Sequence, residues 1–439
     1  MPRRRWRIAF LLSLGVLVNF FDRVNLSVSQ DALHASFGIS LIAFGFLSSA
    51  YNWSYALLQI PSGVLLDRFG VRRVGRVSTF LWSMASFAAS ISTGVVGFFS
   101  ARLLLGVGEA PTFPSNAKAL GYWFPEAERS LATAITDAAA KFSTAIGVPI
   151  LGVLLLHFGW RWSFAATGAI SFLYFVLFSF TYFNPSDDKS LSPEEYEFMK
   201  RGGVQPEDAA HVEAMRAQAA ADAAAGNKTS GASLGYLLRQ PKVYGLGLGW
   251  GAYNYNFYML LTWLPSYLAM SHHVDLLRSV MYTSVPWLFA TATDLLVGGW
   301  LVDALILRGY DANRVRKTVM VIGMGLGLGI LAAATAHSIT AALVWISISL
   351  GGLSAAAPVA WTVPSLIAPR ESVGRVGGIV NMCGQVGAIS APIITGYAAA
   401  ITHKFSSAFV LATAILLLGI AGYIFLLRRI EPIPEPLAE

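Results

Sequence analysis

Charged residues are scarce in this chain of 439 residues: only 13% are Asp, Glu, Lys or Arg, against about 25% in a typical soluble protein. Hydrophobic residues make up 55%, and the mean hydropathy is +0.58. Together with runs of about twenty apolar residues, this composition excludes a soluble domain and predicts a protein that crosses a membrane many times. Cysteine is almost absent, and the single Cys383 excludes an intrachain disulfide.

The sequence also lacks the motifs of several functional classes. It has no Walker motif, so ATP is not expected as an energy source, and no nucleophile–base–acid set inside the apolar runs, so an enzyme is not expected. The glycine-rich stretches 245–251 and 323–329 follow no strand, which favours close helix packing over a nucleotide loop. His272, His273 and Asp275 have no further histidine ligand nearby. Neither a metal nor a cofactor is therefore predicted.

The apolar runs predict an all-α membrane protein with twelve transmembrane helices in two six-helix halves. The expected N-terminal half is 1–183, the polar segment 184–240 is a cytoplasmic linker, and the C-terminal half is 241–439. The expected spans are 8–30, 40–66, 75–93, 95–122, 131–156, 162–183, 243–269, 278–305, 317–337, 340–367, 374–401 and 406–428.

An internal repeat supports the two halves. Gly63-Val-Leu-Leu-Asp67 closes the second span, and Gly299-Trp-Leu-Val-Asp303 closes the eighth, which is the second span of its half. Similar sequences at equivalent positions are typical of a duplicated architecture.

The formal net charge of +7 reflects topology rather than nucleic-acid binding. Of the 31 Lys and Arg residues, only Arg161, Arg278 and Lys404 fall in expected outside loops. The positive-inside rule then places both chain ends in the cytoplasm, in a cell inner membrane. The basic start of the chain is similar to a signal peptide, but Asp22-Arg23 interrupts its apolar run, which predicts an uncleaved first helix.

Charged residues inside the spans are the strongest functional signal. Asp22 and Arg23 lie in the first span, and Arg102 and Glu109 lie in the fourth. Ionisable groups at membrane depth are costly and usually mark a path for ions or substrate. Arg102 and Glu109 are seven residues apart, which places them on nearly one helix face about 10 Å apart. The pattern predicts an anion bound by arginine and protons carried by the carboxylates, although a buried salt-bridge network is the alternative.

Further polar residues lie in other spans. Asp137 and Lys141 are four residues apart on one helix face, so they either neutralise each other or Lys141 adds a positive site suited to a dianion. Neutral hydrogen-bonding groups suited to substrate hydroxyls are Tyr253, Asn256, Asn381 and Gln385, with polar helix packing as the alternative. Asp294 is a further embedded acid, and neither it nor Asp137 has a predicted role in transport.

Three motifs carry a resemblance to a known family. The loop Gly63-x-x-x-Asp67-Arg68-x-Gly-x-Arg72-Arg73 resembles the signature of the major facilitator superfamily. The segments that begin Asn19-Phe-Phe-Asp22-Arg23 and Arg102-x-x-x-Gly-x-Gly-Glu109 resemble its anion:cation symporter family, which includes bacterial galactonate, hexuronate and glucarate transporters, sialin and vesicular glutamate transporters.

The resemblance implies proton-coupled symport of a small organic anion, most simply a sugar acid. Arg23 and Arg102 would anchor the substrate, Asp22 and Glu109 would carry protons, and Gly63, Asp67, Arg68, Arg72 and Arg73 would form a cytoplasmic gate. The expected partners are the anion, protons and the lipid bilayer, in a monomer whose two halves rock about a central site. An exporter or uniporter of another organic acid in the same fold, or a membrane enzyme, are the rival hypotheses.

Overall fold

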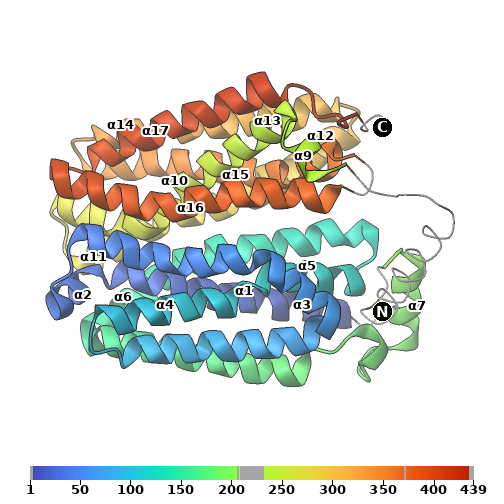
Figure 1. Cartoon of the computed structure of the whole chain (residues 1–439), viewed down its shortest axis with the longest axis horizontal. Helices are drawn as coiled ribbons and strands as arrows, with labels where there is room; N and C mark the ends of the chain where they lie inside the picture. Colours follow the sequence, from blue (N-terminus) through green and yellow to red (C-terminus); the bar gives the residue numbers. More distant parts are fainter. Residues whose placement is uncertain (1–2, 205–206, 208–231, 370–371, 435–439) are drawn as a thin grey trace. The chain divides into compact units, whose positions relative to one another are not determined.

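Helices make up almost all of the computed structural model, which describes residues 3–204, 207, 232–369 and 372–434. No β-strand occurs among these residues (Figure 1). The first part of the chain forms α1 (Arg4–Val28), α2 (Gln30–Phe37), α3 (Leu41–Ser90), α4 (Val95–Glu109), α5 (Thr112–Trp123), α6 (Glu126–Thr181), the 3₁₀ turn η1 (Pro185–Asp187) and α7 (Pro193–Arg201).

The second part begins with the short α9 (Leu234–Leu237) and continues with long helices. These are α10 (Pro241–His272), α11 (Leu276–Thr293), the π-helix η2 (Asp294–Leu301), α12 (Val302–Leu307), α13 (Ala312–Gly327), α14 (Gly329–Ala334), α15 (Ile339–Ile367), α16 (Val373–Thr402), α17 (Ser406–Ala421) and the π-helix η3 (Gly422–Leu427).

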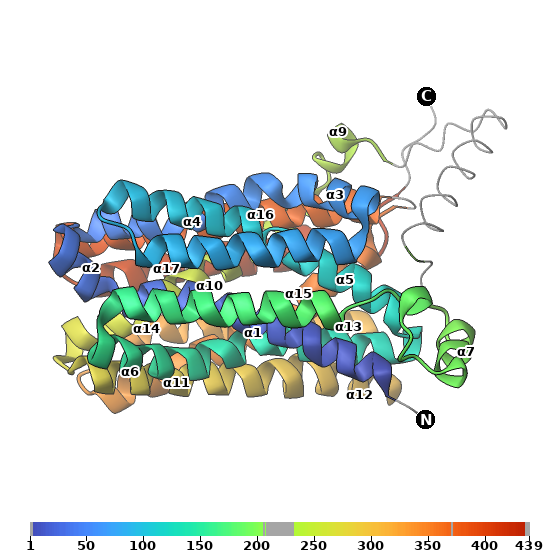
Figure 2. The same ribbon diagram turned by 90° about the horizontal axis from the view of Figure 1, so that it is seen from below.

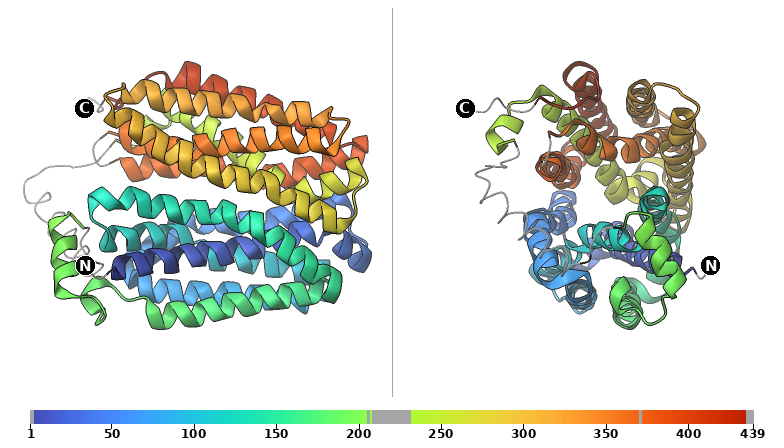
Figure 3. Two further views of the ribbon diagram at one scale, coloured as in Figure 1. Left: turned by 180° about the vertical axis from the view of Figure 1, so that it is seen from behind. Right: turned by 90° about the vertical axis from the view of Figure 1, so that its right-hand side faces the viewer.

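Two of these helices are too long to be single spans. α3 has 50 residues and α6 has 56, which at 1.5 Å per residue would reach about 75 Å or more, over twice the ~30 Å hydrocarbon core. Each is interrupted by a glycine with a positive φ, Gly70 at 78° and Gly159 at 79°. Two helices meet across a kink at each of these glycines, so α3 and α6 each provide two spans; Figure 3 shows the helices from two further sides.

The remaining spans also match helices, several of them broken. By length and composition, seven helical stretches of the described chain could cross a bilayer, or eight if α2 and α3 are taken as one bent pair. The fourth expected span is divided into α4 and α5 at Ala110–Pro111, and the eighth continues from α11 through η2 into α12. With α3 and α6 divided at their glycines, the helices account for all twelve expected spans.

The described chain separates into two compact units, each with its own packed interior. Unit 1 comprises Met1–Asp22, Trp53–Ser143 and Arg161–Thr229, and unit 2 comprises Arg23–Asn52, Thr144–Trp160 and Ser230–Glu439. The borders fall inside α1, α3 and α6, so residues 23–52 and 144–160 group with the C-terminal helices. The boundaries predicted at 183 and 240 remain predictions.

Close helix contacts in each unit depend on glycine. In unit 1 a Cβ at Gly108 would lie 2.6 Å from the backbone nitrogen of Trp82, and in unit 2 a Cβ at Gly387 would lie 2.3 Å from the carbonyl oxygen of Gly251. Without side chains at these points α4 approaches α3, and α16 approaches α10, almost backbone to backbone. This packing of small residues is typical of membrane helices.

The start of the expected linker is held to the first helix within unit 1 (Figure 2). Arg4 forms an ion pair with Asp188 at 2.8 Å, and the Arg5 guanidinium forms one with Glu195 of α7 at 2.8 Å. Both acids are buried. The alanine-rich stretch of the linker up to Gly226 lies outside the described residues.

Candidate functional site

The Asp22 carboxylate is held by hydroxyl groups inside unit 1. Asp22 is 1% exposed. Ser86 of α3 donates a hydrogen bond to its Oδ1 at 2.5 Å, and Ser171 of α6 donates one to its Oδ2 at 2.8 Å. Each carboxylate oxygen therefore accepts a hydrogen bond from a different helix, so both oxygens of this buried group have a donor.

Arg102 approaches the same residue from α4, but at its backbone. Its Nη1 donates to the carbonyl oxygen of Asp22 at 3.1 Å, and its side chain is buried. Arg102 and Asp22 therefore lie next to each other in unit 1. A guanidinium has five N–H donors in a rigid fork, so this bond commits one of them and fixes the plane of the group.

Glu109 is the last residue of α4 and is fully buried. The helix stops there because Pro111 cannot continue the backbone hydrogen-bond pattern, and α5 begins at Thr112. The acid therefore lies at a break inside the fourth span, two helical turns beyond Arg102. Broken membrane helices often provide ion and substrate sites, because backbone groups there are no longer committed to the helix.

Arg23 belongs to unit 2 and has aromatic neighbours. Its Nη1 donates to the hydroxyl of Tyr258 at 3.2 Å, and its guanidinium carbon lies 4.6 Å from the centre of the Tyr51 ring. Only 6% of the residue is exposed. Stacking on a ring stabilises a buried guanidinium.

Lys141 and Asp137 form the expected ion pair in α6, with Nζ to Oδ2 at 2.8 Å. The two side chains differ in surroundings, because Lys141 is 4% exposed and Asp137 is 43% exposed. Water can solvate the acid but hardly reaches the base. Loss of the carboxylate would therefore destabilise the buried Lys141 ammonium more than loss of the ammonium would destabilise the Asp137 carboxylate.

The neutral candidates lie on α10 and α16 in unit 2. Tyr253 stacks on Trp250 with ring centres 5.1 Å apart, and Trp250 also packs 5.2 Å from Trp361. The Asn256 amide donates to the carbonyl oxygens of Ala252 at 3.0 Å and Ala412 at 3.4 Å, but its Oδ1 is buried without a hydrogen-bond partner.

Gln385 on α16 is likewise buried, and its Oε1 has no hydrogen-bond partner. Asn381 lies one turn earlier and is half-buried. Free amide oxygens accept hydrogen bonds, so Gln385 and Asn256 offer acceptors suited to the hydroxyl groups of a polyol.

The motif that begins at Gly63 has a partner that the sequence analysis missed. Lys118 of α5 forms an ion pair with Asp67 at 2.8 Å and also donates to the Leu66 carbonyl at 3.2 Å. The sequence feature that could have indicated this contact is a lysine near the end of the fourth span, which is opposite in charge to Asp67 at the end of the second span. The ion pair ties the motif to α5.

Two arginines of the motif lie against aromatic rings, whereas Asp67 forms an ion pair. The Arg72 guanidinium lies 3.7 Å from the centre of the Phe183 ring, and Arg68 stacks on Phe69 at 5.3 Å. Burial lowers the pKa of Arg72, and the charge of Arg76 adds to this effect while Asp187 opposes it. Arg73 is exposed, and Gly63 has open space where a Cβ would lie.

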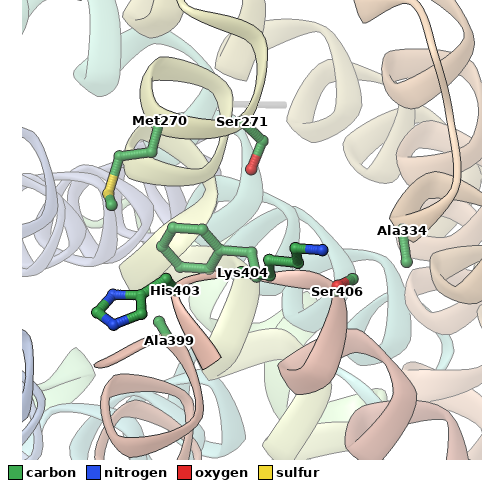
Figure 4. A pocket seen from close by; sticks show the side chains of 8 residues that line it. Met270, Ser271, Ala334, Ala399, His403, Lys404 and Ser406 are labelled. Carbon is green, nitrogen blue, oxygen red and sulfur yellow. The ribbon is translucent and has the colours of Figure 1, made fainter. Parts of the chain in front are cut away.

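A cavity of about 280 Å³ opens among the loops that join the C-terminal helices of unit 2 (Figure 4). His403 and Lys404 contribute to its lining, but their side chains point in different directions. None of the predicted substrate or proton residues lines this cavity. The other lining residues are Met270, Ser271, Ala334, Ala399, Phe405 and Ser406.

Sequence reasoning also missed the hydroxyl residues around the charged groups, namely Ser86, Ser171, Tyr51 and Tyr258. Serine is common in membrane spans and usually donates to its own helix, so its type alone carries little signal. The only available signal was their position inside apolar runs that pack near Asp22 and Arg23.

Among the described residues, several helical stretches long and apolar enough to cross a bilayer, with charged side chains buried among them, are typical of multi-pass membrane transporters rather than enzymes. The family model described as Major Facilitator Superfamily matches residues 12–310 and 304–439. The chain belongs to this superfamily. The predicted all-α transporter fold is thereby confirmed.

Among proteins of similar sequence, the "Uncharacterized transporter YybO" of Bacillus subtilis (strain 168) is 37% identical over 98% of this chain and 95% of its own. The "Probable galactarate/D-glucarate transporter GarP" of Escherichia coli (strain K12) is 32% identical over 97% of this chain and 95% of its own. The "D-galactonate transporter" of Escherichia coli O6:H1 is 29% identical over 98% and 97%.

Solved structures share the fold at low identity. A bacterial homolog of the human lysosomal transporter Spinster, in an inward-facing and occupied conformation, has a TM-score of 0.74 at 16% identity and covers 97% of both chains. The D-xylose-proton symporter has a TM-score of 0.70 at 16% identity and covers 98% of both chains.

Proposed function

We propose that this transporter is a proton-coupled symporter of a sugar acid, of the aldarate, aldonate or hexuronate type, that works by alternating access. The observation that carries the proposal is the burial of Arg102 and Asp22 next to each other in the interior of unit 1, where Arg102 donates to the Asp22 backbone carbonyl. An arginine and an acid at membrane depth are costly, and such groups mark substrate and proton paths. Relatives named as galactarate, glucarate and galactonate transporters support the choice of sugar acid.

Arg102 and Arg23 are the proposed anion anchors. Arg102 contacts the backbone carbonyl of Asp22, and Arg23 contacts a phenol and a ring face, so both guanidinium groups are buried where a carboxylate of the substrate could bind. Lys141 would add a positive charge for the second carboxylate of a dianion. Tyr253, Asn256, Asn381 and Gln385 would bind the hydroxyl groups that distinguish a sugar acid from a simple carboxylate.

Asp22 and Glu109 are the proposed proton carriers. Both are buried acids in spans that also hold a proposed anchor, Arg23 beside Asp22 in the first span and Arg102 with Glu109 in the fourth. Uptake of an anion together with protons reduces the net charge that must cross the low-dielectric interior, which lowers the cost of the movement. The Gly63–Arg73 loop would act as the cytoplasmic gate, with the Asp67–Lys118 ion pair as its fixed contact.

Transport in proteoliposomes tests this proposal directly. Purified protein should concentrate labelled galactarate, glucarate or galactonate when the outside is acidic, and should catalyse counterflow of the same compound without a pH gradient. Counterflow with no response to the pH gradient would favour the alternative, an exporter or uniporter of an organic acid. No transport of any sugar acid would refute the substrate class.

A multi-pass membrane position is established by the fold, and its orientation is the remaining proposal. The basic residues predict that both chain ends and α7 face the cytoplasm of a cell with an inner membrane. In a Cys383→Ala background, Lys189→Cys should react with an impermeant maleimide only after the cells are opened. Arg278→Cys, in an expected outside loop, is the matched control and should react in intact cells. Labelling of Lys189→Cys in intact cells would show that the protein has the opposite orientation in the membrane.

A further inference from the structure

Most hydroxyl groups near Asp22 bond to their own helix, but two do not. On α3, Ser83 donates to the carbonyl of Phe80 at 2.7 Å, and Ser90 donates to that of Phe87 at 2.7 Å. Ser86 lies between them and instead donates across to the Asp22 carboxylate. On α6, Thr167 donates to the Phe164 carbonyl at 3.0 Å and also hydrogen-bonds the Asp22 side chain, and Ser171, one turn later, donates to Asp22.

We infer that Ser86 and Ser171 are positioning residues that allow Asp22 to bind and release its proton while it stays buried. This inference rests on the proposed function, because it concerns the proton step of symport. It assigns these two serines a role in coupling that is separate from substrate binding. Neither residue touches a proposed substrate-binding side chain in the described structure.

The chemistry of the hydroxyl group carries the argument. A carboxylate accepts hydrogen bonds only, whereas a carboxylic acid also donates one. A serine hydroxyl can donate to the charged form and, after rotation, accept from the neutral form. Its own proton then has an acceptor in the carbonyl one turn back, as Ser83 and Ser90 already demonstrate. Both protonation states are therefore satisfied, and neither leaves a buried polar group unpaired.

Lysine or arginine side chains in place of the serines could not satisfy both protonation states of Asp22. A lysine or arginine bound to both oxygens would stabilise only the charged carboxylate. Protonation of the carboxylate would then leave a buried cation without a negative partner. Among the charged groups around Asp22, Arg102 of α4 bonds to its carbonyl oxygen and its charge also acts on the carboxylate, while the adjacent Arg23 bonds to Tyr258. Glu109 lies at the far end of α4, and Tyr174, on α6, places its hydroxyl where a Cβ on Gly15 would stand.

The serines also connect proton binding to helix contacts. Asp22 lies on α1, Ser86 on α3 after the Gly70 break, and Ser171 on α6 after the Gly159 break. Two hydrogen bonds to a charged acceptor hold these three helices together at one point. When Asp22 is neutral, at least one of the bonds becomes an ordinary neutral one, which is weaker. Proton arrival therefore loosens α1 from α3 and α6.

The pH dependence of substrate binding tests the inference. Intrinsic tryptophan fluorescence of purified protein gives the affinity for galactarate, glucarate and galactonate between pH 5 and 9. The wild type should change its affinity by up to about tenfold per pH unit for each coupled proton. The Ser86→Ala/Ser171→Ala protein should lose the part of this pH dependence that belongs to Asp22, because a buried carboxylate without these two donors favours its protonated form.

Conservative and neighbouring changes separate positioning from folding. Ser86→Thr/Ser171→Thr keeps both hydroxyls and should restore the wild-type pH profile. Ser83→Ala and Ser90→Ala remove buried hydroxyls of the same helix that bond only to its backbone, and should leave the profile unchanged. The single Ser86→Ala protein provides a milder change, with an intermediate profile, if the double variant does not fold.

Proteoliposome assays complete the test. The double alanine variant should exchange substrate by counterflow but lose accumulation driven by a pH gradient. A wild-type profile and wild-type accumulation in that variant would overturn the inference while leaving the proposed symport intact. A wild type that shows neither pH-dependent binding nor proton-driven accumulation would instead refute the proposed function itself.

Discussion

The N-terminal six spans and the C-terminal six spans use different chemistry in their interiors. Buried charges in the N-terminal spans include Asp22, Arg102, Glu109 and Lys141. In the C-terminal spans the described buried polar side chains are mostly neutral, as in Asn256 and Gln385, with Asp294 at the start of the η2 π-helix as an acid. The repeated Gly-x-x-x-Asp motifs mark a common architecture, but the interior residues have diverged.

This difference suggests a division of tasks. Charges bind a carboxylate strongly but cannot distinguish one sugar acid from another, whereas amide and phenol groups have directional donors and acceptors that match particular hydroxyls. We therefore expect changes in the N-terminal spans to abolish binding or coupling, and changes in the C-terminal spans to alter affinity and selectivity. The following experiments test that expectation.

The largest effect is expected at Arg102. Arg102→Ala should weaken substrate binding by about 100-fold or more, because a charge-assisted bidentate pair contributes about 3 kcal/mol. Arg102→Lys should not restore binding, since an ammonium cannot form the fork. Isothermal titration with galactarate measures both. Arg278→Ala removes an exposed arginine outside the bundle and is the control. Normal affinity in Arg102→Ala would refute its role as an anchor.

The proton carriers should separate binding from coupling. Glu109→Gln mimics the protonated acid permanently, so counterflow should continue while accumulation under a pH gradient is lost. A gradient of one pH unit supports ~10-fold accumulation per proton, which should fall to about onefold. Asp22→Asn should behave similarly, with a weaker pH dependence of binding. If both variants still concentrate substrate like the wild type, these carboxylates do not couple protons and the symport hypothesis fails.

A smaller and asymmetric effect is expected from the Asp137–Lys141 pair. Asp137→Asn leaves a buried ammonium without its carboxylate and should lower the melting temperature by several degrees, whereas Lys141→Met leaves an acid that water can reach and should lower it less. If the pair is structural, the double variant should fold and transport better than Asp137→Asn. If Lys141 instead binds a second carboxylate, the double variant should transport galactonate but not galactarate.

The fold could be predicted from the sequence in most respects, because lipid imposes strong constraints on it. Only helices satisfy all backbone groups of a spanning segment in hydrocarbon, so apolar runs of about twenty residues translate directly into spans. The breaks were less visible. The division of the fourth span at Pro111 and the π-helices η2 and η3 depend on packing between helices, which hydropathy does not report.

The candidate site could be predicted only as far as its charges. Asp22, Arg102 and Glu109 were evident because acids and arginines are expensive in apolar sequence. Ser86 and Ser171 are separated from Asp22 by 64 and 149 residues, and their hydroxyls became meaningful only when their hydrogen bonds were seen to leave their own helices. Lys118 carried no recognisable signal of its own in the sequence, since its partner Asp67 lies 51 residues away.

The smallest effect is expected at Gln385, and it tests the C-terminal side of the comparison. Its Oε1 is buried without a hydrogen-bond partner, so Gln385→Ala removes an acceptor that the substrate alone would use. The KM for galactarate should rise about fivefold, which corresponds to the ~1 kcal/mol of one neutral hydrogen bond, and the melting temperature should stay unchanged. Met382→Ala changes an exposed side chain of the same helix and is the control.

The measurement that tests the role of Gln385 compares galactarate with succinate, a dicarboxylate without hydroxyl groups. If Gln385 binds a hydroxyl, the variant loses affinity for galactarate but not for succinate, and selectivity falls. Equal losses for both compounds would mean that Gln385 supports the shape of α16, and that neutral groups of the C-terminal spans do not determine selectivity.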